Sequence, residues 1–263
     1  MEKNAIEQAA SPGIRNGITA QGEDGYRYSI EPFLLADFTR PRPGGSVLDV
    51  GSGCGIIPLL LLKRHPGLTL TGVEIQPELH AWAVRNIREA GAEKQIELIE
   101  GDIAALTPTW KRESFDAIVS NPPYRKQGTG RINPDRGKAI ARHELTLDLK
   151  SLVAASALLL KPGGSLTLAY PPARLAEVLA VLEGHGLFIH RLRFIHGHSG
   201  ADASIFLVEA VKAQKTDCRV EQPLTVYNPD RSYTREMEEI YASLDHPDGA
   251  DHDGKKRYRP RAG

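Results

Sequence analysis

Short apolar runs alternate with helix-forming stretches over most of this chain, and this alternation constrains the fold more than any other feature of the sequence. From Gly45 onward, β-branched or apolar runs are each followed by a longer stretch with helical character. Strands that alternate with helices usually become parallel neighbours joined by right-handed crossovers. The pattern therefore predicts an α/β fold, with helices on both faces of a mostly parallel sheet.

We expect seven strands, the last two forming an antiparallel hairpin at the C-terminal end of the sheet. Pro77 opens a helix at a position where its missing N–H costs nothing, and Gly91 follows the end of that helix. The residues from Lys161 to Gly164 should end a long helix and turn the chain into the fifth strand. The strands are predicted at 46–50, 68–74, 95–101, 115–120, 165–170, 187–195 and 204–211, and the helices at 58–65, 77–89, 145–160 and 171–184.

This alternation also divides the chain into four parts. Residues 45–212 form the predicted α/β domain, and residues 1–44 form a polar N-terminal segment that we expect to cover it. An aromatic cluster at 25–38 could form a strand or a helix that packs against the sheet. Residues 213–244 are expected to pack on the domain as an extension. The charged tail, residues 245–263, is too poor in apolar residues to fold alone, so we expect it to be disordered.

Composition and charge exclude several classes of protein. The chain has 33 basic and 33 acidic residues, so its net charge is 0, and any polyanion must meet a local basic patch. Cys54 and Cys218 supply neither a disulfide framework nor the paired cysteines of a structural zinc site. The sequence contains no targeting signal, and no apolar run approaches about 18 residues. We therefore expect a cytoplasmic protein without a membrane span.

The first predicted strand leads into a glycine-rich turn in which Asp49, Gly51, Gly53 and Gly55 have the spacing D-x-G-x-G-x-G. Glycines at the carboxyl end of a central strand let the backbone approach a ligand closely. A dinucleotide-binding loop would have a small residue where this chain has Ile56, and a Walker A loop would need a lysine that is absent here. The spacing therefore disfavours a phosphate-binding loop.

This glycine spacing resembles motif I of the class I S-adenosylmethionine-dependent methyltransferases, in which the loop wraps the methionyl part of the cofactor. Glu74 ends the second strand, where a carboxylate can accept hydrogen bonds from ribose hydroxyls. In that family, an acidic residue after the third strand binds the adenine amino group and its neighbour packs on the ring, which here implies Asp102 and Ile103. The cofactor-binding residues that we expect are Tyr26, Asp49, Gly51, Ser52, Gly53, Gly55, Glu74, Ile75, Asp102, Ile103 and Asn121.

The fourth strand ends in the tetrapeptide Asn121, Pro122, Pro123 and Tyr124, which resembles motif IV of amino-group methyltransferases. An amine conjugated to a ring or a carbonyl is a weak nucleophile, so catalysis needs placement in line with an electrophilic methyl group. The Asn121 side-chain carbonyl and the Pro122 backbone carbonyl can each accept one N–H of such an amine. The prolines stiffen this frame, and Tyr124 offers a flat face on which a planar target can stack.

The residues after this tetrapeptide are strongly basic, and they help to choose among substrates. A basic segment beside a pocket for a flat target suits a nucleic-acid backbone, although a solvated charged loop would have the same composition. The residues that we expect to contact RNA are Arg125, Lys126, Arg131, Arg136, Lys138 and Arg142.

Residues 15–242 as a whole resemble the bacterial adenine-N6 methyltransferases of valine tRNA, which modify adenosine 37 beside the anticodon. The resemblance is carried by Gln21, the aromatic cluster from Gly25 to Ser29, the glycine loop, the Asn121 tetrapeptide, the basic segment after it and the late stretch YNPDRSYT. It implies that the N-terminal tyrosines cover the cofactor and that tRNA is the partner. The longer charged C-terminal tail departs from the family pattern.

Three alternatives remain open. Glutamine-N5 methyltransferases that act on release factors share the Asn121 tetrapeptide, but they usually carry a sizeable helical domain before motif I, and only 48 residues precede Asp49 here. Guanine-N2 methyltransferases of rRNA share it as well. A non-catalytic RNA-binding module would not need both the glycine loop and this tetrapeptide. The sequence does not determine the oligomeric state, and a monomer is compatible with it.

A metal site is not expected. His196 and His198, with Asp202 nearby, lie in a predicted hairpin turn and lack an obvious third ligand. We interpret them as turn residues and expect no metal.

Overall fold

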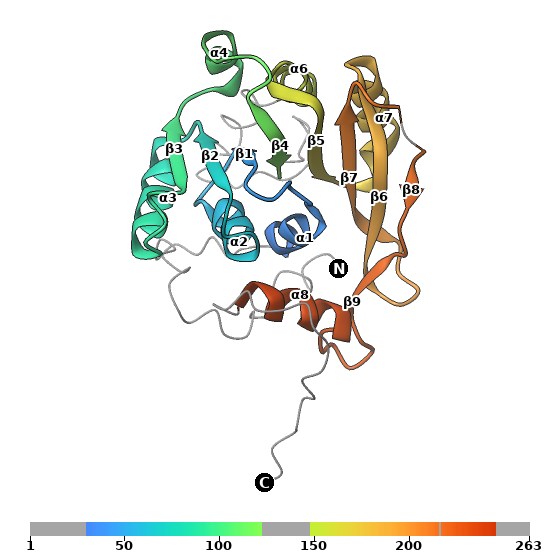
Figure 1. The fold of residues 1–263 in the computed structure, drawn as a ribbon. Helices are drawn as coiled ribbons and strands as arrows, with labels where there is room; N and C mark the ends of the chain where they lie inside the picture. The colour runs from blue at the N-terminus through green and yellow to red at the C-terminus, as the bar shows by residue number, and fades with distance from the viewer. Residues whose placement is uncertain (1–29, 123–147, 216, 246–263) are drawn as a thin grey trace, which may run out of the picture.

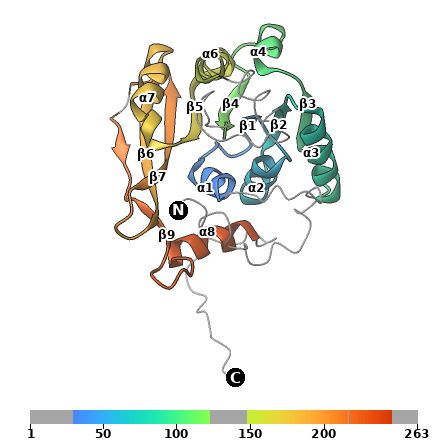
Figure 2. The same ribbon diagram turned by 180° about the vertical axis from the view of Figure 1, so that it is seen from behind.

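The computed structural model describes residues 30–122, 148–215 and 217–245, and one mixed sheet runs through the middle of this part of the chain. Figures 1 and 2 show the sheet from opposite sides, with helices on both of its faces. The strands are β1 (Ser46–Val50), β2 (Thr69–Glu74), β3 (Ile96–Glu100), β4 (Phe115–Ser120), β5 (Leu160–Tyr170), β6 (Leu187–His198), β7 (Ala203–Lys212), β8 (Arg219–Val220) and β9 (Leu224–Tyr227). The helices are α1 (Glu31–Phe38), α2 (Ile56–Arg64), α3 (Pro77–Glu89), α4 (Ile103–Leu106), α6 (Leu149–Leu159), α7 (Leu175–Gly184) and α8 (Arg235–Asp245), with short 3-10 turns η1 (Thr107–Thr109) and η2 (Pro172–Arg174).

The direction in which successive strands are added reverses at the middle of the sheet, between β1 and β4. The order is β3-β2-β1-β4-β5-β7-β6-β8, and β9 also pairs with β6. After β1 the chain moves outward through β2 to β3, and it then returns to place β4 on the other side of β1. Ligands of open α/β sheets bind outside the carboxyl ends of the strands at such a switch point. The residues that follow β1 and β4 are therefore adjacent by topology.

Two apolar clusters hold helices to the two faces of this sheet. One joins α1, α2 and α8 with the side chain of Ile87 from α3, and the other joins α6 and α7 with Ile103 from α4. The first six residues of α2, from Ile56 to Leu61, are all buried, because α2 lies between the sheet, α1 and α8. Burying one such aliphatic side chain stabilises a fold by about 1.5 to 3 kcal/mol. This burial explains why the helix after the glycine loop is apolar all round.

The predicted α/β fold with helices on both faces and a C-terminal antiparallel hairpin is confirmed. β1, β4 and α3 have the predicted bounds, and β7 pairs antiparallel with both β5 and β6. The sheet has two short strands beyond the seven predicted, β8 and β9, both parallel to β6. No membrane-spanning helix is present in the described part of the chain, since none of its helices is both long and apolar enough.

The turn expected at Lys161 to Gly164 is instead a bulge inside β5. Phe115 of β4 pairs with Leu160, whereas Ala117 pairs with Ser165, so three extra residues are accommodated on the β5 side. Gly164 permits this bulge, because a Cβ at this residue would lie 2.9 Å from the Asp116 carbonyl oxygen. The extended chain therefore begins directly where α6 ends.

The helix expected at 145–160 begins at Leu149, and residues 145–147 lie outside the described residues. Asp148 caps it, because its Oδ1 accepts hydrogen bonds from the backbone N–H groups of Lys150 and Ser151, at 2.8 and 3.1 Å. The Ser151 hydroxyl also donates to Asp148 Oδ2, and this hydrogen bond first, followed by those from the two backbone N–H groups, holds the pKa of Asp148 below its usual value against the opposing effect of burial.

The segment after β7 packs against the domain through a buried ion-pair network. Arg191 of β6 is buried and donates to both carboxylate oxygens of Glu209 on β7, at 3.0 and 2.7 Å. It also donates to Glu221, between β8 and β9, at 3.2 Å, and to the carbonyl oxygen of Phe38 at 2.7 Å. One guanidinium thus joins the hairpin, the later strands and the end of α1.

Candidate cofactor and catalytic site

The glycine loop lies between β1 and α2 and is anchored to the neighbouring strand. The backbone N–H groups of Gly51 and Ser52 both donate to the carbonyl oxygen of Val73 in β2, at 2.8 and 3.0 Å. Gly53 has a φ of 55°, and a Cβ at this residue would meet nothing within 4 Å. Its backbone is therefore left open to a ligand. Gly55 has a different role, because a Cβ there would lie 3.2 Å from that of Ala83 in α3.

Asp49 is a fully buried acid directly before this loop. Its Oδ2 accepts a hydrogen bond from Ser52 Oγ at 2.7 Å, whereas its Oδ1 is buried and has no hydrogen-bond partner among the described residues. Burial is the largest cause that raises the pKa of Asp49 to about 7, the Ser52 hydrogen bond opposes the rise, and the charge of Glu74 adds to it. An unpaired buried oxygen is costly unless a donor satisfies it. Asp49 thus offers an acceptor to a ligand in the loop.

Glu74, at the carboxyl end of β2, is buried and holds the loop in place. Its Oε2 accepts from the backbone N–H of Gly53 at 2.8 Å, and its Oε1 accepts from that of Gln76 at 2.9 Å. A carboxylate has about four lone-pair sites, so further acceptor capacity remains for the hydroxyl groups of a ligand. The sequence indicated Glu74 as a ligand residue, but it did not show that the same side chain also fixes the conformation of the loop.

Asn86 is a residue that the sequence analysis missed. It is buried on the inner face of α3, and its Nδ2 donates to the carbonyl oxygen of Cys54 at 2.9 Å. Its Oδ1 is buried without a hydrogen-bond partner among the described residues. The sequence does contain a signal for it: in the helical spacing of α3, this asparagine shares the buried face with Ala83 and Ile87. Asn86 therefore supports the glycine loop from behind.

The acid expected after the third strand lies at the same edge. Asp102 caps the N-terminus of α4, where its Oδ1 accepts from the backbone N–H of Ala104 at 2.9 Å. A cavity of about 30 Å³ opens between the ends of β1, β2 and β3. Its lining includes Val50, Gly51, Val73, Ile75, Asp102 and Ile103. The structure therefore brings the described cofactor-binding candidates from three strands together, whereas Tyr26 lies outside the described residues.

Asn121 follows β4 directly, next to the glycine loop. Ser120 Oγ donates to the carbonyl oxygen of Val50 at 2.7 Å, which ties the last residue of β4 to the last residue of β1. The Asn121 Nδ2 atom lies 3.3 Å from Oε2 of Glu31, the first residue of α1, and donates to it. Glu31 was not among the predicted site residues.

The other catalytic and RNA-binding candidates are only partly described. Pro122 is buried beside Asn121. Pro123, Tyr124, Arg125, Lys126, Arg131, Arg136, Lys138 and Arg142 lie outside the described residues. Their roles stay predictions.

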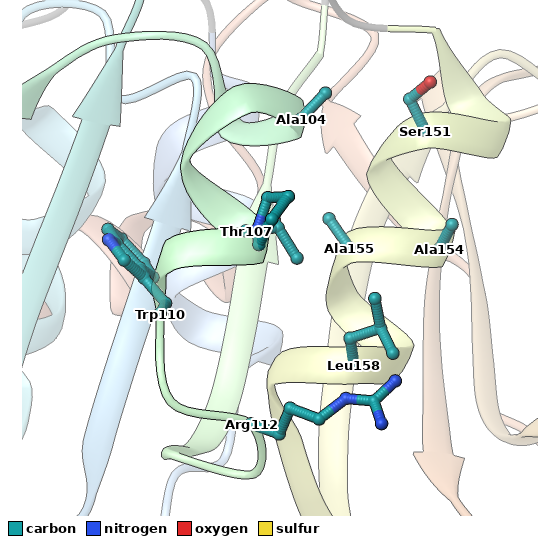
Figure 3. A pocket seen from close by; sticks show the side chains of 9 residues that line it. Ala104, Thr107, Trp110, Arg112, Ser151, Ala154, Ala155 and Leu158 are labelled. Carbon is teal, nitrogen blue, oxygen red and sulfur yellow. The ribbon is translucent and has the colours of Figure 1, made fainter.

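A larger cavity, of about 430 Å³, lies between the helix pair α4 and η1 and the helix α6 (Figure 3). Arg112 and Leu158 line one end, and Ala104 and Ser151 line the other (Figure 3). None of the predicted site residues lines it. The cavity is therefore separate from the glycine loop, although α4 is next to both.

His196 and His198 lie in the last residues of β6 rather than in the predicted turn, and each has a local partner. Their Nδ1 atoms lie 2.7 Å from the Ala201 carbonyl oxygen and 3.0 Å from the Ser199 carbonyl oxygen. Within residues 30–122, 148–215 and 217–245, no three His, Cys, Asp or Glu side chains are grouped as metal ligands would be.

Comparisons with known proteins agree with this geometry. The family model described as "Methyltransferase small domain" matches residues 31–179. A protein of Porphyromonas gingivalis named tRNA1(Val) (adenine(37)-N6)-methyltransferase is 31% identical over 82% of this chain and 89% of its own length. One of the same name from Tolumonas auensis is 28% identical over 80% of this chain and 86% of its own.

The fold is also found among solved structures. A predicted O-methyltransferase of Agrobacterium tumefaciens superposes with a TM-score of 0.65, at 21% identity, over 81% of this chain and 96% of the other. At this identity the likeness concerns the fold alone. The family match over more than half of the chain, the relatives that align along most of its length, and the glycine loop beside Asn121 lead to one conclusion: this chain belongs to the methyltransferase small domain family of S-adenosylmethionine-dependent methyltransferases.

Proposed function

We propose that this protein transfers a methyl group from S-adenosylmethionine to the N6 amino group of an adenine in tRNA, with adenosine 37 of valine tRNA as the expected target. The observation that carries this proposal is the position of Asn121. It leaves β4 at the same sheet edge where the glycine loop leaves β1, and β1 and β4 are hydrogen-bonded neighbours. The names of the relatives from P. gingivalis and T. auensis support the choice of substrate.

The residues at the ends of β1, β2 and β3 fit this cofactor. The orphaned Oδ1 of Asp49 suits a donor group, and the open backbone at Gly53 leaves room beside it. Glu74 has acceptor capacity for the ribose hydroxyls, and Asp102 and Ile103 line the small cavity beside which we place the adenine ring. When bound, the cofactor supplies a methyl group on a sulfonium, which is already strongly electrophilic.

The residues after β4 then have to position the amine. Asn121 accepts one amine N–H through its side-chain carbonyl, and the Pro122 carbonyl accepts the other, so the nitrogen lone pair is aimed at the methyl carbon. Both acceptors also favour the positive charge that develops on the nitrogen. Tyr124 is expected to stack on an adenine that is extruded from its loop.

The partner side of the proposal rests on the basic segment after Tyr124, whose arginines and lysines would neutralise phosphates of the anticodon loop. A glutamine side chain on a release factor and a guanine in rRNA remain the alternatives that share the Asn121 tetrapeptide. Neither substrate would require the chain to recognise a tRNA anticodon loop, so the three can be distinguished by their products.

The test offers methyl-labelled cofactor together with three substrates: a valine tRNA transcript, rRNA and a release factor. Digestion of the products should give N6-methyladenosine from the tRNA alone, and a transcript with guanosine at position 37 should give none. Asn121→Ala serves as the control with strongly reduced but measurable turnover. Label recovered as N2-methylguanosine or as N5-methylglutamine would contradict the proposal and identify the alternative.

A further inference from the structure

Glu31 lies at the start of a helix that is almost entirely buried. α1 begins at Glu31, with Pro32 in its first turn, and packs against α2, β5 and α8. The buried residues of this short helix are Pro32, Phe33, Leu34, Leu35, Ala36 and Phe38. Burial of so many side chains fixes the helix to the domain. The partly buried Glu31 carboxylate is therefore presented from a rigid support.

The partner of this carboxylate is the candidate catalytic amide. Asn121 Nδ2 lies 3.3 Å from Glu31 Oε2, although the two residues are 90 positions apart in the chain. An ionised carboxylate can only accept hydrogen bonds, and an asparagine amide has its donors and its acceptor on opposite branches. The contact therefore fixes the orientation of the Asn121 amide. Its NH2 group faces Glu31, and its oxygen is on the opposite branch of the amide.

We infer that Glu31 is a positioning residue for methyl transfer, which holds the Asn121 amide in the orientation that presents its oxygen to the target amine. The inference rests on the proposed function, because it assigns Asn121 the role of amine acceptor. If the amide were flipped, its NH2 group would face the N–H groups of the substrate, and two donors would oppose each other. The hydrogen bond from Ser120 to Val50 fixes the strand ends but not this side-chain rotation.

The charge of Glu31 contributes in a second way. During transfer, the amine nitrogen forms the bond to the methyl carbon, the carbon–sulfur bond breaks, and its electron pair remains on sulfur. The nitrogen carries positive charge until it loses a proton to solvent. A carboxylate hydrogen-bonded to the Asn121 amide increases the negative partial charge on the amide oxygen, which favours that positive charge.

The experiment is a double-mutant cycle with wild type, Glu31→Ala, Asn121→Ala and the double variant, assayed for methylation of valine tRNA. We expect Glu31→Ala to lower kcat by about 10- to 100-fold while the KM for tRNA and the calorimetric affinity for the cofactor change less than about threefold. In the Asn121→Ala background, Glu31→Ala should lower kcat by less than about threefold. Glu31→Gln keeps an acceptor oxygen without the charge and should recover part of the loss.

Asp37→Asn is the matched control, because it removes an acid from the other end of the same helix, where Asp37 pairs with Arg64 at 2.6 Å. It should leave kcat unchanged, and thermal unfolding of each variant reports the state of the fold. If Glu31→Ala does not fold, Glu31→Gln takes its place in the cycle. If the wild type is active and the kcat losses of Glu31→Ala and Asn121→Ala multiply in the double variant, the inference is overturned and the proposed function stands. A wild type that produces no N6-methyladenosine would overturn the proposed function together with it.

Discussion

Ser120 and Val50, the last residues of two adjacent parallel strands, are joined by a hydrogen bond of 2.7 Å from the serine hydroxyl to the valine carbonyl oxygen. Asn121 follows the first of them and Gly51 the second. The candidate catalytic amide and the candidate cofactor loop therefore follow two strand ends that one buried hydroxyl group joins. Ser120 lies outside the motifs that indicated the function, and Val50 occupies an unspecified position of the glycine motif, between Asp49 and Gly51.

Ser120→Ala should therefore affect both stability and catalysis. The variant leaves the Val50 carbonyl oxygen without this donor, and we expect the free energy of unfolding to fall by about 1 to 2 kcal/mol. Loss of the link between the strand ends should also lower kcat by about tenfold, since small misplacements of reacting groups are costly. Denaturant unfolding and single-turnover methylation measure the two effects.

The control for this variant is Ser114→Ala. Ser114 Oγ donates to the carbonyl oxygen of Lys111 in an exposed turn, so its loss should change the free energy of unfolding by less than about 0.5 kcal/mol. If Ser120→Ala behaved like Ser114→Ala in both measurements, the strand-end link would have no part in positioning Asn121.

Much of this arrangement was predictable, because it follows from local pattern and topology. Five-residue and six-residue β-branched runs bounded by turn residues predicted β1 and β4 with their bounds, and Pro77 marked the start of α3. Once those strands are parallel and adjacent, the glycine loop and Asn121 must share an edge.

The remainder depends on contacts between distant residues. The exposed two-residue strand β8 exists only because it pairs with β6, and its sequence has no strand pattern of its own. Lys161 to Gly164 has the composition of a turn, yet pairing on both sides of it makes it a bulge. The Glu74 clamp spans 21 residues and the Glu31 contact spans 90, so neither could be found from spacing along the chain.

The pKa of about 7 for Asp49 predicts opposite effects of Asp49→Asn on stability and on binding. Between pH 4 and 7 the folded protein holds a proton that the unfolded chain has released, so the wild type loses stability relative to Asp49→Asn as the pH rises through this range. Above pH 7 the buried wild-type carboxylate is ionised, and the difference stays constant. Denaturant unfolding of both proteins at pH 4, 5.5 and 7.5 measures it.

Cofactor affinity should show the reverse dependence. If the ionised Asp49 binds a donor group of the cofactor, the wild-type affinity relative to that of Asp49→Asn should rise about tenfold from pH 6 to pH 8, as the ionised fraction increases. Comparison with the variant removes any titration of the cofactor itself. A constant ratio of affinities across this range would exclude an ionised Asp49 from cofactor binding.

Glu74 is predicted to act on cofactor affinity through two routes, the loop clamp and the ribose hydroxyls. Glu74→Ala removes the acceptor of the Gly53 N–H, so the loop loses its conformation and the ligand loses an acceptor. We expect the cofactor Kd to rise by at least about tenfold, measured by calorimetry. Glu100→Ala is the matched control, because Glu100 is the register partner of Glu74 on the adjacent strand β3 and its side chain is exposed. A similar Kd for both variants would remove Glu74 from the site.

The buried guanidinium of Arg191 should be one of the largest single contributors to the stability of the β6–β7 hairpin. Its side chain is 4% exposed, and Arg191→Met leaves the carboxylate of Glu209, which is 7% exposed, without its cation. Breaking such a pair by removing one partner costs about 3 to 5 kcal/mol, whereas replacing both partners by apolar residues can be nearly neutral. We therefore expect Arg191→Met to lose about 3 kcal/mol or more in denaturant unfolding.

The double variant Arg191→Met with Glu209→Met should regain most of that loss, because the uncompensated charge is then absent. In the double variant Glu221 would lose Arg191 but keep Arg40, which lies 3.7 Å away, and its side chain is 13% exposed, so water can replace part of the lost interaction. If the double variant were no more stable than Arg191→Met, the contribution of Arg191 would depend on the shape and hydrogen bonds of the guanidinium rather than on charge compensation.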